Sequence, residues 1–168
     1  MSSDFSVRRA IPEDGAATSS LLEVIVSERT HSAIDRAWTP DEQRAYIASL
    51  SDREALHVAV DTAGHVIGSQ SIERYSTSLQ SMNHVAQLGT FVLPEWRGRG
   101  VGQALFAATR EFARSAGFRK IVIQVRASNR GAQEFYKRLG FVECGRFRGQ
   151  VVIDGQEDDE ILMETFLL

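Results

Sequence analysis

The spacing of hydrophobic positions changes several times along the chain, and each change marks an expected element. Residues 5–11 alternate between apolar and polar side chains, as a half-buried strand does. Apolar positions then recur at helical spacing to about Glu28, behind Pro12, a residue favoured in the first turn of a helix. Residues 39–42 (TPDE) place an N-cap threonine, a proline and two acids in order, which predicts a second helix to about Leu50.

The middle of the chain has mostly strand periods. Residues 55–61 and 65–75 flank a short glycine turn and predict a hairpin, and a third long strand is expected over 84–93. The remaining elements follow in order: a helix from about 101 to 116 ended by Gly117, a strand over 120–127, a short helix over 129–139, and two strands, 141–147 and 160–168, around an Asp-Gly turn in 151–158.

The predicted order is therefore β-α-α-β-β-β-α-β-α-β-β. Strands separated by a helix pair in parallel, whereas strands joined by short turns pair antiparallel. We expect an α/β fold in which one mixed, largely antiparallel sheet has a parallel central pair and is flanked by helices. Residues 1–168 are expected to form a single domain.

Composition narrows the class of protein. The chain has 168 residues and 43% hydrophobic content, which is ordinary for a soluble globular protein, and no apolar run is long enough for a membrane span. Its N-terminal segment lacks the apolar region of a secretory signal, so a cytoplasmic location is expected. The single cysteine, Cys144, excludes an internal disulfide, and we expect it to be a small buried hydrophobe. No metal site is expected, because the histidines are scattered.

The net charge of −3 hides an asymmetry. Residues 97–148 hold 12 of the 19 Lys and Arg with only three acids, so this segment is strongly basic and the remainder strongly acidic. One interpretation is a basic half for an anionic cofactor and an acidic half for a cationic partner; the other is helix surfaces that happen to be basic. Residues 157–160 (EDDE) are expected to be a solvated hairpin edge that deters sheet pairing, although they could also attract a cationic acceptor.

The stretch WRGRGVG, residues 96–102, directly precedes the helix expected from about 101. Glycines at a helix N-terminus let backbone amides approach an anion closely, and the anion bound at such sites is usually a phosphate. A Walker loop is excluded because the chain has no Gly-Lys pair. A Rossmann turn is excluded because, counted from Gly98, its third glycine would fall on Gln103.

A third pattern, [Q/R]-x-x-G-x-[G/A], is matched by Arg97, Gly100 and Gly102. Together with VRASNRGAQEFYKRLGF at 125–141, it resembles the GCN5-related N-acetyltransferase superfamily most strongly over residues 84–141. The resemblance implies that family's fold and an acetyl-coenzyme A site. In it, the loop would hold the pyrophosphate through Arg97, Gly98, Arg99, Gly100, Val101, Gly102 and Gln103.

The same resemblance assigns the rest of the cofactor site. The backbone of Thr90, Phe91 and Val92 would pair with the pantetheine arm as an added strand does, in a slot where this strand diverges from residues 120–127. Asn129 would hydrogen-bond the arm. Tyr136 would place its hydroxyl beside the thioester sulfur and protonate the leaving thiolate.

The general base has more than one candidate. Relatives that acetylate protein N-termini carry a glutamate five residues before the asparagine, and here Gln124 stands there, which counts against that activity. Glu28, His31 and Glu73 are the alternatives. Glu28 ranks first, because residues 25–47 resemble the loop of phosphinothricin-type acetyltransferases, in which an acid lines the acceptor pocket.

The predicted function is transfer of an acetyl group from acetyl-coenzyme A to a primary amine of a small molecule or peptide, by direct attack in a ternary complex. A cationic acceptor is the first guess, with no nucleic-acid or membrane partner. The alternatives are an acetyl-coenzyme A-binding protein without transferase activity, an N-terminal acetyltransferase, and a nucleic-acid binder that uses the basic segment. Either a monomer or a homodimer is compatible with the sequence.

Overall fold

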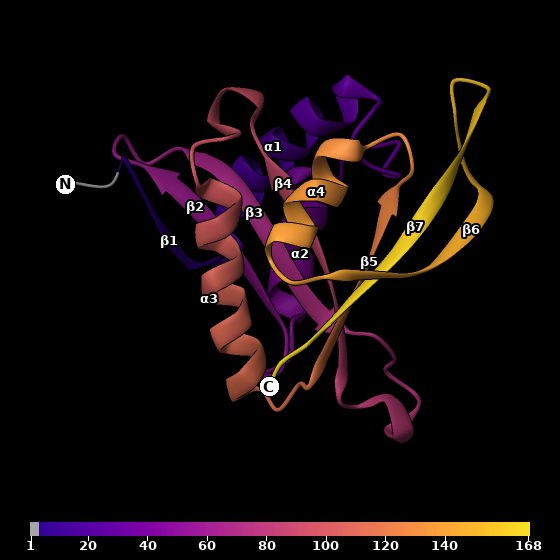
Figure 1. Cartoon of the computed structure of the whole chain (residues 1–168). Coiled ribbons are helices and arrows are strands. Elements are labelled where there is room, and N and C mark those ends of the chain that lie inside the picture. Colours follow the sequence, from indigo (N-terminus) through magenta and orange to yellow (C-terminus); the bar gives the residue numbers. More distant parts are fainter. Residues whose placement is uncertain (1–3) are drawn as a thin grey trace.

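The computed structural model describes residues 4–168, whose seven strands form one sheet in the order β1-β2-β3-β4-β5-β7-β6 (Figure 1). The strands are β1 Phe5–Arg9, β2 Ala55–Asp61, β3 Val66–Arg74, β4 Val85–Val92, β5 Lys120–Arg126, β6 Val142–Ile153 and β7 Gln156–Phe166. The α-helices are α1 Gly15–Glu28, α2 Pro40–Ser49, α3 Val101–Ser115 and α4 Arg130–Arg138.

The pairing confirms the predicted fold class. Neighbouring strands are antiparallel except β4 and β5, which run parallel because α3 connects them. Helices α1 and α2 pack on one face of the sheet, where Leu21, Ile25 and Ile47 meet Leu56 and Val58. Helices α3 and α4 lie on the other face.

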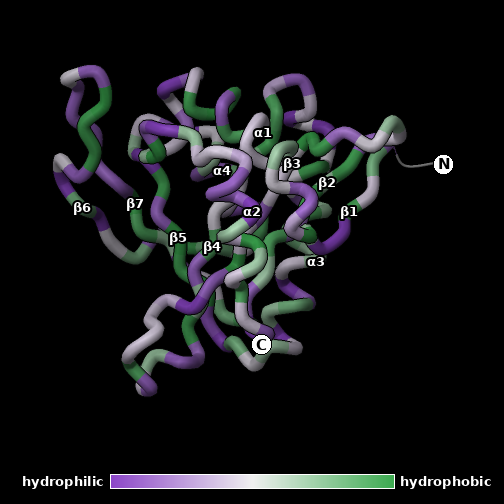
Figure 2. The backbone as a smooth tube through the Cα atoms, turned by 180° about the vertical axis from the view of Figure 1, so that it is seen from behind, coloured by the Kyte–Doolittle hydropathy of each residue, from purple (hydrophilic) through white to green (hydrophobic). Residues whose placement is uncertain are grey.

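The helix ends follow the signals in the sequence. The Thr39 hydroxyl accepts the amide of Glu42 at the start of α2, with Glu42 bonding back to the threonine amide. Gly117, directly after the C-cap of α3, has a φ of +82°, a conformation that costs glycine little. Figure 2 shows the hydrophobic segments gathered along the central strands. Within residues 4–168, no helix combines the length and apolar character needed to cross a bilayer.

The C-terminal hairpin is longer than predicted. The expected intervening segment is itself part of the strands, since β6 continues to Ile153 and β7 begins at Gln156, leaving only Asp154 and Gly155 in the turn. Strand β7 lies between β5 and β6, so it is paired on both sides. The acidic run 157–160 is therefore not a sheet edge, and β6 is the edge strand instead.

Strands β4 and β5 pair over three positions only, from Val85 opposite Lys120 to Gln87 opposite Val122. Beyond these positions the two strands separate, as Figure 1 shows. Residues 88–92 of β4 therefore have a ladder partner on the β3 side alone. A backbone edge inside the sheet is left open at this point.

Candidate active site

A cavity of about 1180 Å³ lies where β4 and β5 separate. Its walls come from β4, β5, β7 and α4, and the loop before α3 closes one end. The cavity includes Thr90, Phe91 and Val92, whose backbone edge faces away from β3. An extended chain rich in amide groups could pair with that edge without disturbing the sheet.

The glycine loop forms the N-terminus of α3. Gly98 and Gly100 have φ values of +71° and +85°, which non-glycine residues rarely adopt. Gly100 is the N-cap residue and provides no side-chain cap, so the first-turn amides are not used by a capping side chain. Gly102 packs on Phe135, because an added Cβ would come within 2.9 Å of the ring. The loop thus presents backbone donors to the cavity.

Tyr136 lies at the other wall of the cavity, on α4. Only 6% of the residue is exposed, and its hydroxyl donates to Thr90 Oγ1 at 2.8 Å. Thr90 Oγ1 also accepts from Nε2 of the fully buried Gln70 at 2.7 Å. Burial raises the pKa of Tyr136 to about 12, so the phenol keeps its proton at neutral pH. The structure thus brings two predicted site residues, Thr90 and Tyr136, into direct contact.

The structure has the features that the resemblance to GCN5-related N-acetyltransferases implied. These are a slot between separated parallel strands, a glycine loop at its end and a protonated tyrosine beside it. A family model for acetyltransferases of the GNAT family matches residues 21–141. The chain belongs to the acetyltransferase (GNAT) family.

Curated relatives have different substrates in their names. This GNAT chain is 24% identical over 154 residues to YwnH of Bacillus subtilis, provisionally named a phosphinothricin acetyltransferase, with 92% of this chain and 94% of the relative covered. It is 28% identical over 145 residues to the aminoglycoside N(6')-acetyltransferase type 1 of Stenotrophomonas maltophilia, covering 84% and 88%.

A solved structure shows the same fold. The phosphinothricin acetyltransferase of Sinorhizobium meliloti, in complex with acetyl-coenzyme A, superposes with a TM-score of 0.89 at 18% identity, covering 97% of this chain and 88% of that one.

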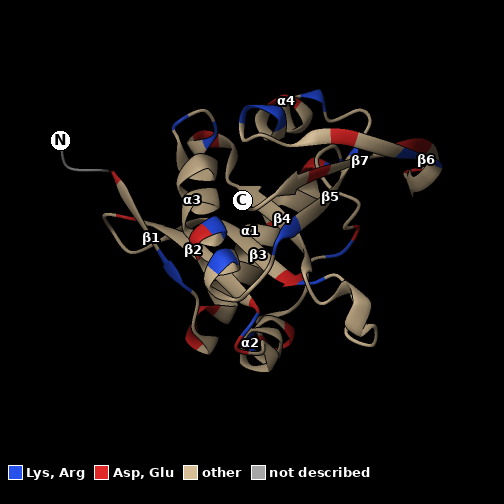
Figure 3. Ribbon diagram, turned by 60° about the horizontal axis from the view of Figure 1, so that its bottom comes forward, with Lys and Arg blue, Asp and Glu red and all other residues tan. Residues whose placement is uncertain are grey.

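Arg97, the first residue of the GNAT loop pattern, is exposed, but its guanidinium already has protein partners. Its Nε donates to the Val92 carbonyl at 3.0 Å, and its two terminal nitrogens hold the carboxylate of Glu28 at 2.7 and 2.5 Å. Arg99, in contrast, stacks over Trp96 with its guanidinium carbon 4.1 Å from the ring centroid, and contacts Asp4. Figure 3 shows the Lys and Arg residues along α4 and the acids around α2.

The Arg97 contact changes the interpretation of Glu28. The bidentate hydrogen bonds from Arg97 lower the pKa of Glu28, and His31 Nε2 adds a contact at 3.1 Å. A carboxylate held in this way is a poor proton acceptor. The assignment of Glu28 as the general base stays a prediction. Its contacts favour a different role, in which Glu28 orients Arg97 at the loop.

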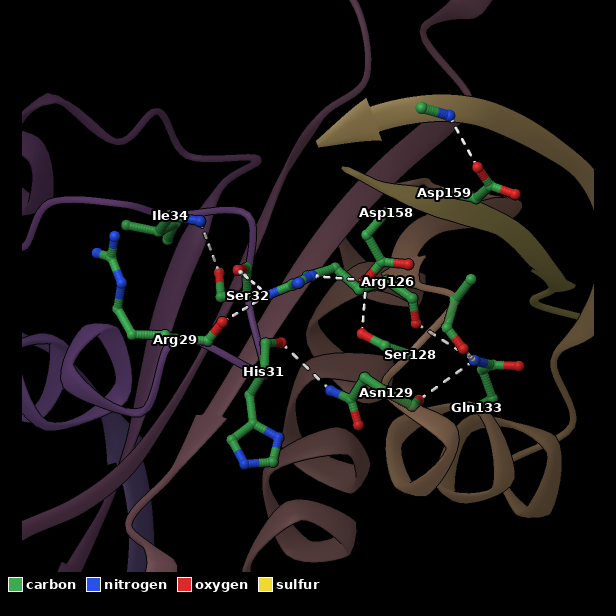
Figure 4. Close-up of polar contacts among 12 residues, drawn as sticks. Arg29, His31, Ser32, Ile34, Arg126, Ser128, Asn129, Gln133, Asp158 and Asp159 are labelled. Atoms are coloured by element: carbon green, nitrogen blue, oxygen red, sulfur yellow. Dashed lines mark hydrogen bonds and ion pairs between the residues drawn. The ribbon is translucent and has the colours of Figure 1, made fainter. Parts of the chain in front are cut away.

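The Asn129 side chain has two partners, and Figure 4 shows one of them, the His31 carbonyl. Asn129 Oδ1 accepts the amide of Ala132 and so caps α4, while Nδ2 donates to the His31 carbonyl at 3.2 Å. His31 and Asn129 both line the cavity. A ligand that takes the Asn129 amide must therefore displace the loop between α1 and α2 from it.

Arg126 was not singled out from the sequence. This buried side chain donates to Asp158 at 2.9 Å and to the carbonyl of Arg29 at 2.8 Å, which fastens the loop after α1 to the end of β5 (Figure 4). The sequence did contain a signal for it. Ile121, Ile123 and Val125 face the core of α3 and α4, so strand alternation places Arg126 on the opposite face of the sheet.

The sheet face that carries α1 and α2 supplies the remaining polar groups. Glu73 lines the cavity and accepts a short hydrogen bond from the Tyr46 hydroxyl. Gln124 is exposed there. The prediction for Cys144 is wrong: it is exposed and also lines the cavity, because it follows Glu143 at an irregularity in the β6 ladder.

Two further observations complete the site. Glu160, expected to be solvated with the other acids of 157–160, is only 7% exposed and lines the cavity from β7. Among residues 4–168, no group of three or more His, Cys, Asp or Glu side chains is arranged to hold a metal ion.

Proposed function

We propose that this protein is a cytoplasmic N-acetyltransferase that moves an acetyl group from acetyl-coenzyme A to a primary amine of a small molecule or peptide. The observation that carries the proposal is the open edge of β4, residues 88–92, with the glycine loop of α3 at its end. Acetyl-coenzyme A combines an amide-rich arm with a pyrophosphate, and these two features of the site match those two groups.

The residues fit the ligand in detail. Backbone amides of residues 98–103 would hold the pyrophosphate at a helix N-terminus, where the helix dipole adds attraction for anions. Arg97 can turn from Glu28 to the phosphates, a move that exchanges one anionic partner for another. Asn129 would exchange the His31 carbonyl for a pantetheine group.

The thioester supplies an activated acyl carbon, so no nucleophilic side chain is needed. Tyr136 would donate a hydrogen bond to the leaving sulfur, in place of its present one to Thr90. This role requires a protonated phenol, and the pKa of about 12 keeps it so across the physiological range.

Direct attack requires a neutral amine, so a base must accept a proton from the acceptor. The sequence offers Glu28, His31 and Glu73 as candidates. Of these three, Glu28 is bound by an arginine, Arg97, which makes it the poorer proton acceptor. Gln124 cannot accept the proton as a glutamate would, which disfavours the N-terminal acetyltransferase alternative. The relatives named for phosphinothricin and for an aminoglycoside support a small-molecule acceptor, and a Bacillus subtilis relative provisionally named a ribosomal-protein alanine N-acetyltransferase supports a peptide.

The cofactor site is tested with two matched glycine variants. Gly100 and Gly64 both have positive φ and open space around an added side chain, but Gly64 lies in the β2–β3 turn. Aspartate at either position should strain the backbone by roughly 1–2 kcal/mol. Only Gly100→Asp also places a negative charge where the pyrophosphate would bind.

The measurement is the rise in melting temperature with acetyl-coenzyme A. Wild type and Gly64→Asp should show the rise, and Gly100→Asp should show none at the same concentration. Equal shifts in the two variants would refute the loop assignment. Release of coenzyme A thiol with a panel of amines then separates a transferase from a binding protein without activity. Because Cys144 is exposed, a blank without acceptor is needed to subtract its reaction with the thiol reagent.

A further inference from the structure

Glu160 is a buried carboxylate that faces the cavity without a partner. The residue is 7% exposed, and within residues 4–168 its side chain makes no hydrogen bond or ion pair. Its carboxylate oxygens are accessible from the cavity, since they are not among the side-chain atoms that are both enclosed and without a hydrogen bond. A cationic ligand in the cavity would supply the missing partner.

The other cavity-facing carboxylates of the described chain are already engaged. Glu164 is paired with Lys120 at 2.5 Å, and Glu73 accepts from Tyr46. The cation nearest to Glu160 in the ladder is Arg126, its direct partner on β5, but that guanidinium turns to Asp158 and to the loop after α1 (Figure 4). The charge of Arg126 is therefore used elsewhere, and Glu160 remains open toward the cavity.

Glu160 lies close to Gln124, the position on β5 at which relatives that acetylate protein N-termini carry a glutamate. Gln124 is opposite Leu162 and Arg126 is opposite Glu160, so Gln124 and Glu160 are diagonal neighbours on adjacent strands. Diagonal neighbours on one face of a sheet are about 7–8 Å apart, within reach of long side chains. Ile161 and Met163 pack in the core of α3 and α4, which places Glu160 and Gln124 on the opposite face of the sheet.

We propose that Glu160 binds the ammonium group of the acceptor and takes its proton before attack. This rests on the proposed transferase function. The ammonium proton passes to the Glu160 carboxylate, and the neutral nitrogen forms a bond to the acetyl carbon as the carbon–sulfur bond breaks. The nitrogen then loses a second proton to solvent to give the neutral amide, and Glu160 releases its own proton to solvent afterwards. The thiolate leaves with the bonding electron pair, accepts a hydrogen bond from the Tyr136 hydroxyl and takes its proton from solvent.

The proposal specifies the acceptor class as a primary alkylamine that is cationic in solution. An ammonium group is attracted to the open carboxylate, whereas an amine that is uncharged at neutral pH, such as an aniline, gains little from it. Phe147, directly opposite Glu160 on β6, provides an apolar wall for the alkyl part.

The pH response depends on the groups around Glu160. Strand β5 contributes Arg126, β7 contributes Asp158, β6 contributes the uncharged Phe147, and the loop after α1 brings His31 and Ser32 to the same cavity. Burial raises the pKa of Glu160, and the Asp158 carboxylate adds to this effect. A raised pKa makes a carboxylate a better proton acceptor from an amine.

The test compares Glu160→Gln with Glu157→Gln. Both lie on β7, but Glu157 is exposed, so it controls for loss of one negative charge on the same strand. Thiol release is measured with butylamine, cadaverine, spermidine and phosphinothricin at pH 5.5–10, together with the melting temperature with and without acetyl-coenzyme A. Glu160→Gln should lower kcat/KM for the amine about 100-fold or more and lose the acidic limb of the pH profile. Glu157→Gln should stay within about twofold of wild type.

Folding and cofactor binding serve as separate readouts. Glu160→Gln should melt at or above the wild-type temperature, because the Glu160 carboxylate has no partner among the described residues to lose, and it should keep the acetyl-coenzyme A shift. Wild-type kcat/KM and an unchanged pH profile in Glu160→Gln would overturn the role of Glu160 alone. If the wild type transfers to no amine of the panel although acetyl-coenzyme A binds, the transferase proposal fails and takes the role of Glu160 with it.

Discussion

The sharpest prediction concerns the Tyr136 hydroxyl, which Tyr136→Phe removes with little change in shape. In the structure this hydroxyl makes one hydrogen bond, to Thr90, and faces the cavity where the thioester sulfur would lie. Thr90 keeps a second partner, Gln70, in the variant. The loss of stability should therefore be about 1 kcal/mol. For a chain of this size that corresponds to roughly 2–4 °C in melting temperature.

The effect on turnover follows from the pKa of the phenol. A thiol such as that of coenzyme A has a pKa near ~8.5, so complete proton transfer from a phenol with a pKa of about 12 is uphill by roughly 5 kcal/mol. Tyr136 should therefore act mainly by hydrogen-bonding the developing thiolate. A hydrogen bond to a charged group contributes about 1.5–3 kcal/mol, so kcat should fall roughly 10- to 100-fold.

The assay is thiol release at saturating acetyl-coenzyme A, with the KM for acetyl-coenzyme A measured in parallel. The KM should change less than about threefold, because the hydroxyl acts in the transition state rather than in binding. Tyr75→Phe is the matched control, since Tyr75 also lines the cavity but is 47% exposed. An unchanged kcat in Tyr136→Phe would refute the role of the hydroxyl. A fall beyond about 1000-fold would instead indicate full proton transfer, with the pKa lowered in the ternary complex.

Two further predictions test other contacts of the fold. Glu28→Gln removes the anion that holds Arg97, so acetyl-coenzyme A should bind a few-fold tighter at low salt while kcat changes little; a 100-fold loss of kcat would instead identify Glu28 as the base. Buried His57 bonds Thr109, and burial lowers its pKa, with Arg9 adding to the effect. The unfolded chain therefore takes up a proton below about pH 6.5 that the folded protein refuses, and the unfolding free energy should decline as the pH falls further. Denaturant titrations from pH 5 to 7.5 should show a flatter dependence for His57→Gln, and equal slopes would contradict this assignment.

Local patterns in the sequence were sufficient for the order of elements and for the parallel pair. Thr39, Gly100 and Gly117 mark helix ends through the chemistry of a single turn, which does not depend on distant residues. The separation of β4 from β5 was expected only through the resemblance to a family, because nothing in either strand shows where their ladder stops.

The polar contacts of the site could not be predicted in the same way. Glu28 and Arg97 are 69 positions apart, and their pairing depends on how α1 docks against the loop before α3. Residues 157–160 look solvated because all four are acids, yet strand alternation turns Glu160 into the cavity while β5 and β6 cover β7 on both sides. Cys144 was misjudged for a related reason, since the irregularity after Glu143 changes which way β6 faces.

The separation of β4 and β5 also places the proposed proton transfer to Glu160 and the hydrogen bond from Tyr136 on opposite faces of the sheet. Tyr136 and Thr90 meet on the face covered by α3 and α4, whereas Glu160 and Gln124 belong to the opposite face. An acyl carbon held in the gap can then be approached by the amine from one face while the sulfur leaves toward the other. Because β7 is fixed by ladders on both sides, a shift of one residue in its register would move Glu160 into the core and Ile161 into the cavity. The register of β7 is therefore as much a requirement of the proposed chemistry as the identity of Glu160.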